Sequence, residues 1–456
     1  MPDRPEPAVS RPLRVAINGY GRIGRCVLRA LMESPHRRDL RIVAINEPAD
    51  LESMAYLTRF DSTHGIFPGE VRVAGGGLEI EGQAIPVFHA REPADGPWGR
   101  LEFDLLLECS GAFSTRDRLR AFLDAGCPRL LVSHPGKSAA DVDCTIVHGI
   151  NDGDLRAGQR IVSAASCTIN AAVPVLDLLE RRLGVESAFL TTLHSVMNDQ
   201  PMIDGYHHAD LRRTRSAMQS IVPVATGLAQ GIERMLPGLA GRIQAKAVRV
   251  PILNVSAIDL AVNLRRDTTP EALNALFSEA ARARPDLIAC ADQPHASVDF
   301  NHDPHSVVVD LGQTRVNQGR FANLLIWFDN EWGFANRMLD VARAWAGHFL
   351  PPGRPKTKSA PLGGAASGQS PRSVGGDVLP PGRPKAKSAP LGGAASGQSP
   401  RSVGGDVLPP GRPKAKSAPL GGAASGQSPR SVGGDSCFLG SATAPAHATF
   451  SSSPGV

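Results

Sequence analysis

The sequence of 456 residues contains few cysteines and no long apolar run. Its seven cysteines are scattered without CxxC or any other metal-ligand spacing. We therefore expect neither a disulfide framework nor a bound metal, and free thiols suit a reducing compartment. No stretch approaches the length of a membrane span, and the first residues carry no apolar signal segment. These features predict a cytoplasmic protein that does not bind a membrane.

An excess of basic side chains is found only in the last part of the chain, residues 350–456. The formal net charge of +5 divides into +9 from this tail, which has twelve basic and three acidic residues, and −4 from the remainder. The basic character therefore describes the tail and not the body of the protein. It gives no reason to expect a nucleic-acid partner for the body.

The same tail is a tandem repeat with a period of 29 residues. Leu350–Val378 recurs as Leu379–Val407 and again over Leu408–Asp435. Each copy has two leucines and at most two valines among prolines, glycines and serines, which is too little apolar surface to form the core of a solenoid. The sequence predicts a disordered tail.

The body opens with a pattern typical of a nucleotide-binding domain. We expect a strand over Arg14–Asn18, a turn over Gly19–Gly24, a helix over Arg25–Glu33 and a parallel strand over Arg41–Asn46. Two further apolar strands and a helix extend this unit, at Phe103–Glu108, Arg129–Ser133 and Arg116–Ala125. The pattern predicts an α/β fold with a Rossmann-type domain.

The turn carries the glycine pattern GxGxxG at Gly19, Gly21 and Gly24. The first glycine permits a tight turn, the second lets the backbone approach a pyrophosphate, and the helix start, with Arg22 and Ile23, offers N–H donors. Glu47 ends the second strand, where it would accept hydrogen bonds from a ribose and repel a 2′-phosphate. We therefore predict that NAD is bound in preference to NADP. A glycine turn without a ligand is the alternative.

A cysteine and a histidine form the second candidate site. Cys167 follows Ser166, a plausible N-cap residue, at the start of a predicted helix, and His194 ends a predicted strand 27 residues later. A helix N-terminus and an imidazole both favour a thiolate. Either residue alone would more often be structural. Together with a nucleotide-binding domain, they predict oxidation of an aldehyde through a thioester.

Beyond Cys167 the pattern predicts mainly strands, which indicates a mixed or antiparallel sheet with helices on one face. We expect a NAD-binding domain over 13–166, completed by a helix at about 334–349, and a catalytic domain over 167–333. The expected strands and helices of the second part are Ser187–His194, Ala245–Pro251, Asn254–Leu264, Ser306–Asp310, Asn323–Phe328, Pro270–Ala283 and Asn336–Ala346.

Residues 13–349 resemble the glyceraldehyde-3-phosphate dehydrogenase superfamily. The motifs that carry the resemblance are Asn18–Arg25, Asp61–Gly65, Ala165–Thr168, Asp210–Arg215, Arg249–Pro251 and Trp327–Gly333. The resemblance implies a homotetramer and a loop, here about 198–222, that lines the cofactor sites of neighbouring subunits. It also implies roles in holding the nicotinamide and the phosphorylated sugar aldehyde for Asn330, Ser166, Thr168, Arg215, Thr226 and Arg249.

Several stretches resemble the erythrose-4-phosphate dehydrogenases of that superfamily more closely than the glycolytic enzymes. They are Ile45–Asp50, Ser133–Gly136, Asp299–His305 and Gly333–Met338. Met197 stands where the glycolytic enzymes have a threonine that helps hold phosphate, so the resemblance implies a thioester released by water, in pyridoxal phosphate biosynthesis. The alternatives are a phosphorylating glyceraldehyde-3-phosphate dehydrogenase and a NAD-binding interaction protein that uses its basic tail. Ile169 replaces a threonine of the usual motif, and we expect it to alter packing more than chemistry.

Overall fold

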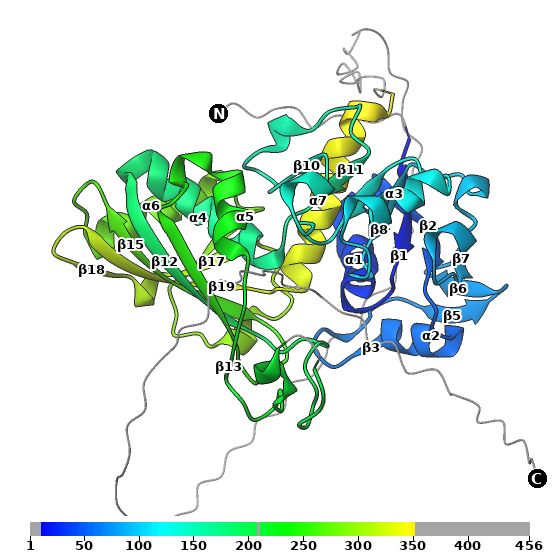
Figure 1. The fold of residues 1–456 in the computed structure, drawn as a ribbon, viewed down its shortest axis with the longest axis horizontal. Coiled ribbons are helices and arrows are strands. Elements are labelled where there is room, and N and C mark those ends of the chain that lie inside the picture. Colours follow the sequence, from blue (N-terminus) through cyan, green and yellow to red (C-terminus); the bar gives the residue numbers. More distant parts are fainter. Residues whose placement is uncertain (1–10, 208–209, 352–456) are drawn as a thin grey trace, which may run out of the picture. The chain divides into compact units, whose positions relative to one another are not determined.

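The computed structural model describes residues 11–207 and 210–351, which all belong to one compact unit. Apart from its first two residues, the predicted tail with its repeats therefore lies outside the described residues. Two large sheets organise the described chain (Figure 1). The expected α/β fold, with a Rossmann-type parallel sheet and a second, mixed sheet, is confirmed. The expected domain boundaries stay a prediction.

The first sheet is parallel over most of its width and ends in an antiparallel hairpin at one edge. Strand β1 lies at its centre, with β2 on one side and β8 on the other, so the chain changes direction there and opens a crevice at the carboxyl ends of the strands. In spatial order its strands are β10 (Cys144–Thr145), β11 (Ile161–Ser163), β9 (Leu130–Val132), β8 (Leu105–Glu108), β1 (Leu13–Asn18), β2 (Leu40–Asn46), β7 (Gln83–Phe88), β6 (Gly77–Ile80) and β5 (Val71–Ala74).

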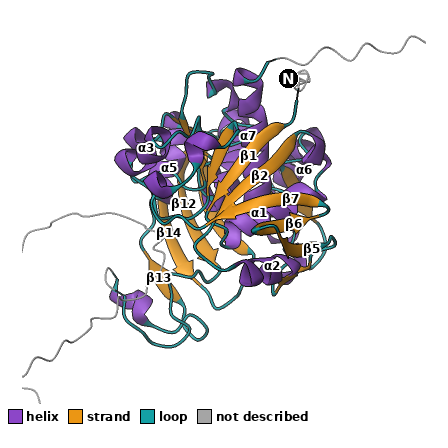
Figure 2. Ribbon diagram, turned by 90° about the vertical axis from the view of Figure 1, so that its right-hand side faces the viewer, coloured by secondary structure: helices purple, strands orange, loops and turns teal. Residues whose placement is uncertain are grey.

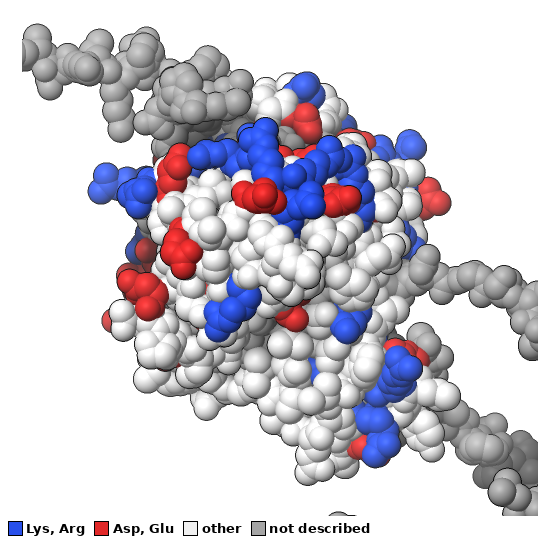
Figure 3. Space-filling view, turned by 90° about the vertical axis from the view of Figure 1, so that its left-hand side faces the viewer, with Lys and Arg blue, Asp and Glu red and all other residues white. Residues whose placement is uncertain are grey.

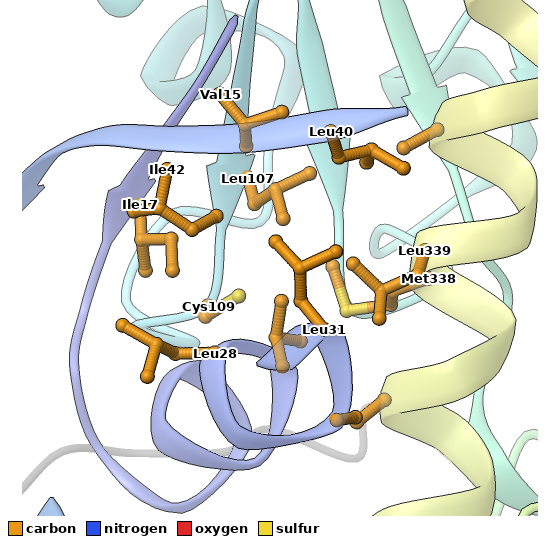
Figure 4. Packing of buried hydrophobic residues seen from close by; sticks show 14 of the residues in the cluster. Val15, Ile17, Leu28, Leu31, Leu40, Ile42, Leu107, Cys109, Met338 and Leu339 are labelled. Atoms are coloured by element: carbon orange, nitrogen blue, oxygen red, sulfur yellow. The ribbon is translucent and has the colours of Figure 1, made fainter. Parts of the chain in front are cut away.

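Helices from both ends of the described chain cover this sheet (Figure 2). The last helix, α7 (Trp332–Phe349), packs beside α1 (Arg22–Glu33), and both share one buried cluster with β1 and β2. Figure 4 shows Met338 and Leu339 facing Leu31 within this cluster. The first sheet thus needs residues more than 300 positions apart to close its core. The other helices of this part are α2 (Leu51–Arg59) and α3 (Arg116–Asp124), and a small hairpin pairs β3 (Phe60–Asp61) with β4 (Gly65–Ile66).

The second sheet is mixed, with two parallel contacts, between β12 and β14 and between β16 and β17. Its buried face shares one core with helices α4 (Cys167–Leu183), α5 (Leu228–Met235) and α6 (Pro270–Ala283). In spatial order the strands are β13 (Val222–Val224), β14 (Ile243–Arg249), β12 (Val185–His194), β15 (Ser256–Leu264), β19 (Phe321–Phe328), β17 (Val307–Asp310) and β16 (Ile288–Ala291), with β18 (Arg315–Asn317) paired to β19.

Most element ends differ from the sequence-based expectations by one to three residues, and two differences have a clear physical reason. Helix α1 begins at Arg22 and not at Arg25, because Gly19 alone of the three motif glycines takes a positive φ, and Gly21 already serves as the N-cap. The final helix is longer at both ends than the expected Asn336–Ala346, since buried Trp332 and Leu350 extend its apolar face. The expected helix Pro270–Ala283 has the observed bounds.

Candidate active site

Cys167 is the first residue of α4, where the backbone turns sharply. The hydroxyl of Ser166 caps the helix by accepting a hydrogen bond from the N–H of Ile169 at 3.2 Å. Ala165 just before it is fully buried with a φ of +61°, a conformation that costs a residue with a Cβ about 1–3 kcal/mol. The thiol therefore sits at the positive end of a helix dipole, as the sequence predicts. Ile169 packs against Gly231 of α5 in the core of the second sheet.

His194 is the last residue of β12, and its ring reaches the thiol. Its Nε2 lies 3.7 Å from the Sγ of Cys167, and its Nδ1 lies 2.9 Å from the backbone oxygen of Ser195. A carbonyl oxygen can only accept, so this contact places the ring proton on Nδ1. Nε2 is then the free acceptor that faces the thiol. The arrangement is that of a nucleophile and its base.

Burial opposes charge on both members of this pair. It raises the pKa of the Cys167 thiol, against the hydrogen bond from Thr168 and the charge of Arg249, which lower it. Burial and the same arginine lower the pKa of His194 to about 3. A neutral imidazole is therefore available as a base at every pH near neutrality. For a thiolate to form, its stabilisation by the helix N-terminus must exceed the free energy that burial of its charge costs.

Three of the predicted anion-binding groups surround this pair. Arg249 ends β14 directly opposite His194 in the parallel ladder. Thr168 places its hydroxyl 3.8 Å from the Sγ of Cys167, and Ser166 caps the same helix. Thr226 lies further along, before α5, where its hydroxyl accepts from the N–H of Leu228.

Arg215 lies apart from these groups. Its guanidinium is 66% exposed and pairs with Asp204 at 2.8 Å in the loop 198–222. No described contact of this side chain joins it to Cys167 or Arg249, so its assignment to the substrate stays a prediction.

Asn330 is held on the other side of His194 by two buried serines. Its Oδ1 accepts hydrogen bonds from the hydroxyl groups of Ser195, at 3.1 Å, and Ser256, at 2.8 Å. All three side chains are almost completely buried. Asn330 therefore has one amide orientation, next to the residue that also orients the base.

The glycine turn has the shape that a dinucleotide requires. A Cβ on Gly19 would lie 2.4 Å from the backbone nitrogen of Ser110, and one on Gly24 would lie 2.2 Å from the oxygen of Gly19. A Cβ on Gly21 would meet nothing within 4 Å, so the space above this residue is open to a pyrophosphate. The first turn of α1 has no side-chain cap and no acidic residue, which leaves its N–H groups to an anion. The turn fits a dinucleotide.

Glu47 and Arg22 flank this turn. The carboxylate of Glu47 accepts a hydrogen bond from the N–H of Tyr20 at 2.7 Å, so the second strand presents it beside the turn as predicted. The guanidinium of Arg22 is engaged by Glu331 and Asp61 and so ties α1 to the start of α7. Ile23 is half-buried against the core of the first sheet.

Family comparisons agree with this geometry. Residues 13–116 match the NAD binding domain of glyceraldehyde 3-phosphate dehydrogenase, and residues 166–330 match the C-terminal domain of the same enzyme. The two matches follow each other in order and together cover more than half of the chain. The chain belongs to the glyceraldehyde 3-phosphate dehydrogenase family. It is an oxidoreductase that uses NAD and acts on a phosphorylated aldehyde.

The site of this dehydrogenase also contains a buried carboxyl group under the cofactor turn. Glu108 ends β8 without any exposure to solvent, and it accepts hydrogen bonds from the side chain of Asn18 and from the N–H and hydroxyl of Ser110. Burial raises the pKa of Glu108 to about 7 in spite of these donors. The carboxyl group supports both segments that shape the turn.

Unfolding of the dehydrogenase is expected to depend on pH through Glu108. Below pH 4.5 the carboxyl group is protonated in both states, and between pH 4.5 and about 7 the unfolded chain loses its proton first. The free energy of unfolding should therefore fall by about 3 kcal/mol as pH rises through this window. The free energy of unfolding in urea is measured for the wild type and for Glu108→Gln from pH 4.5 to 8, and the second is subtracted from the first. His194 is present in both proteins, so its contribution, which has the opposite sign, cancels in the difference. A flat difference would contradict it.

A buried ion pair in the loop that follows β12 has no signal in the sequence. Asp199, five residues after His194, pairs with Arg213 at 2.9 Å, and both side chains are less than 9% exposed. Gly205, Ala217 and their backbone partners fold the intervening loop back on itself, and this brings the two residues together. The sequence motif that contains Arg213 pointed instead to its neighbour Arg215.

The described residues contain no helix that has both the length and the apolar character for crossing a membrane.

Proposed function

We propose that this dehydrogenase oxidises D-erythrose 4-phosphate to 4-phosphoerythronate with NAD, in pyridoxal phosphate biosynthesis. The observation that carries the substrate assignment is Met197, three residues past the base. It lies half-buried in a turn closed by the hydrogen bond from the N–H of Gln200 to its backbone oxygen. A thioether cannot donate a hydrogen bond to phosphate, whereas the threonine of the glycolytic relatives can.

The chemistry begins at Cys167. Its sulfur attacks the aldehyde carbon, the thiol proton passes to Nε2 of His194, and the carbonyl oxygen becomes an alkoxide. The N–H of Cys167 at the helix start and the protonated His194 can stabilise this oxygen. The bound NAD supplies the hydride acceptor. Cys167 is left as a thioester, and His194 returns its proton to the solvent.

Release of the product needs a second use of the base. His194 takes a proton from water, the hydroxide adds to the thioester carbon, and the carbon–sulfur bond breaks to give the carboxylic acid and the thiolate. The positive charge of Arg249 stabilises the thiolate that leaves, since it already lowers the pKa of that thiol. The same guanidinium, with Thr226, would hold the phosphate at the far end of the substrate.

The side chain of Met197 is also the feature that favours water as the acceptor. A thioether offers no donor to a second anion, whereas a hydroxyl group would. Phosphorylation of the thioester is the alternative reaction, and Thr168 and Thr226 are groups that could serve it.

Rates with erythrose 4-phosphate are expected to stay nearly constant as inorganic phosphate is added, because water is the acceptor. We expect Met197→Thr to introduce a phosphate dependence, since it restores a hydroxyl beside the base. Stopped assays that follow NADH measure this phosphate dependence. Each assay uses erythrose 4-phosphate or glyceraldehyde 3-phosphate, with and without inorganic phosphate. Leu193→Thr, at an exposed position of β12 directly before the base, is the control. An absolute phosphate requirement in the wild type, or an acyl phosphate product, would overturn the assignment in favour of the phosphorylating enzyme.

Glu47 is proposed to enforce the choice of NAD over NADP. Its carboxylate is fixed beside the turn by the N–H of Tyr20, in the place where a 2′-phosphate would lie. The ratio of NAD to NADP affinity in Glu47→Ala tests this role, and an unchanged ratio would refute it.

A homotetramer is proposed because the loop 198–222 exposes an unusual amount of apolar surface. Five of its large apolar side chains are more than 70% exposed, and the strands of the second sheet add Phe189 and Phe321. On the side of the molecule that carries this sheet, charged side chains gather in a band and leave a broad area with few charges (Figure 3). Patches of this kind mark protein interfaces. The five exposed loop residues are Met202, Ile203, Tyr206, Leu211 and Ile221. Sedimentation equilibrium measures the number of subunits and tests the proposed tetramer.

A further inference from the structure

Two serine hydroxyl groups converge on one atom of Asn330. Ser195 follows the base at the end of β12, and Ser256 begins β15, the neighbouring antiparallel strand. Both side chains are fully buried, and the N–H of Ser195 donates to the hydroxyl of Ser256 at 3.2 Å. The hydroxyl hydrogen of Ser256 is then free to point at the Oδ1 of Asn330, 2.8 Å away. The three residues form a small hydrogen-bonded network between two sheet strands and the start of α7.

This network decides which end of the Asn330 amide faces outward. With Oδ1 held by two donors, the amide nitrogen must lie on the opposite side of the group. Rotating the amide by half a turn would turn its N–H₂ group toward the two hydroxyl groups, which could then only accept, and both buried hydroxyl hydrogens would lose the acceptor that Oδ1 provides. A buried network with every partner satisfied imposes a single arrangement.

Ser195 also orients the base. Its backbone oxygen accepts a hydrogen bond from the Nδ1–H of His194, and its hydroxyl group donates a hydrogen bond to the Oδ1 of Asn330. One residue therefore fixes the ring that removes the proton and the amide across from it. A shift of Ser195 would disturb both contacts together.

We propose that Ser195 and Ser256 are positioning residues that aim the N–H₂ group of Asn330 at the carboxamide oxygen of the nicotinamide. The proposal rests on the proposed role of Asn330 in holding that carboxamide. It assigns the serines no contact with the cofactor themselves. We expect their effect to be confined to the nicotinamide half of NAD, because within the described residues the contacts of these two hydroxyl groups lead to the cofactor site through Asn330.

Calorimetric titration of the resting full-length protein with NAD and with ADP-ribose, which lacks the nicotinamide, tests this. The double variant Ser195→Ala/Ser256→Ala should bind NAD roughly tenfold more weakly, the size expected for two hydrogen bonds that orient one donor, and should bind ADP-ribose as the wild type does. Ser256→Thr keeps a hydroxyl and should recover most of the NAD affinity. Ser306→Ala removes a buried serine hydroxyl directly before β17, where it accepts from Arg337, and should change neither affinity.

The outcomes separate the possible explanations. Equal loss of NAD and ADP-ribose affinity in the serine variants would show a merely structural role and overturn the proposal, as would no loss of either. Asn330→Ala should reproduce the selective loss of NAD affinity. If it does not, the role of Asn330 itself fails. If Asn330→Ala shows the selective loss and the serine variants do not, the serine proposal alone fails. The single variants Ser195→Ala and Ser256→Ala provide the same comparison if the double variant does not fold.

Discussion

Replacing Cys167 by alanine is expected to abolish turnover and to leave NAD binding intact. The thiol is the proposed nucleophile at the start of α4, 3.7 Å from the Nε2 of His194, while the cofactor turn lies on the first sheet. His194→Asn should lower kcat by a factor of about 10²–10⁴, the usual contribution of a general base. Because the two residues act as a unit, the double variant should be no slower than Cys167→Ala.

Alkylation provides the second measurement of this pair. Iodoacetamide should label Cys167 much faster than the other thiols, and His194→Asn should slow this labelling, since it removes the proton acceptor. Burial raises the pKa of Cys26 and Cys109 well above the usual range, so these thiols serve as internal references. Peptide mass spectrometry follows the labelling of each thiol. Equal rates for Cys167 and the reference thiols would contradict the assignment.

Gly21→Ala is expected to fold normally and to lose NAD affinity by one to two orders of magnitude. A Cβ at this position meets no protein atom within 4 Å, and the backbone φ of −73° suits any residue, so the protein without ligand should keep its stability. The same methyl group would fill the space that a pyrophosphate needs. Overpacking of this kind typically costs about 1–3 kcal/mol.

Two neighbouring variants make this test specific. Gly19→Ala places a Cβ against Ser110 at a positive φ and should destabilise the protein itself. Gly238→Ala, also in open space but on the second sheet's side, should change neither stability nor NAD affinity. Thermal unfolding without ligand and calorimetric titration with NAD distinguish the three. Normal NAD affinity in Gly21→Ala would place the cofactor elsewhere.

The parts of the fold and site that the sequence predicted are those set by short-range geometry. The glycine turn and Glu47 follow from one strand–turn–helix–strand unit, in which spacing alone fixes where each side chain lies. Cys167 was predictable because its N-cap Ser166 marks the helix start. The strand that ends at His194 was recognised as well, although β12 begins two residues before the expected Ser187.

The remaining site residues depend on contacts between distant segments. Ser195 and Ser256 meet Asn330 only because β12 pairs with β15 and β19 carries the chain to the start of α7. The buried pair of Asp199 and Arg213 requires a particular course of the loop between them, which no periodicity encodes. Ala165 has a left-handed backbone that its sequence disfavours, so the strain beside the nucleophile is visible only in three dimensions.

The position of α7 has a consequence for the order in which this protein can fold during synthesis. Its apolar face fills the core of the first sheet next to α1, yet the ribosome synthesises α7 only after every strand of the second sheet. Until then the growing chain must carry the apolar residues of α1 and β1 without their final cover, in a state open to aggregation. The N-terminal domain, although made first, is therefore completed last.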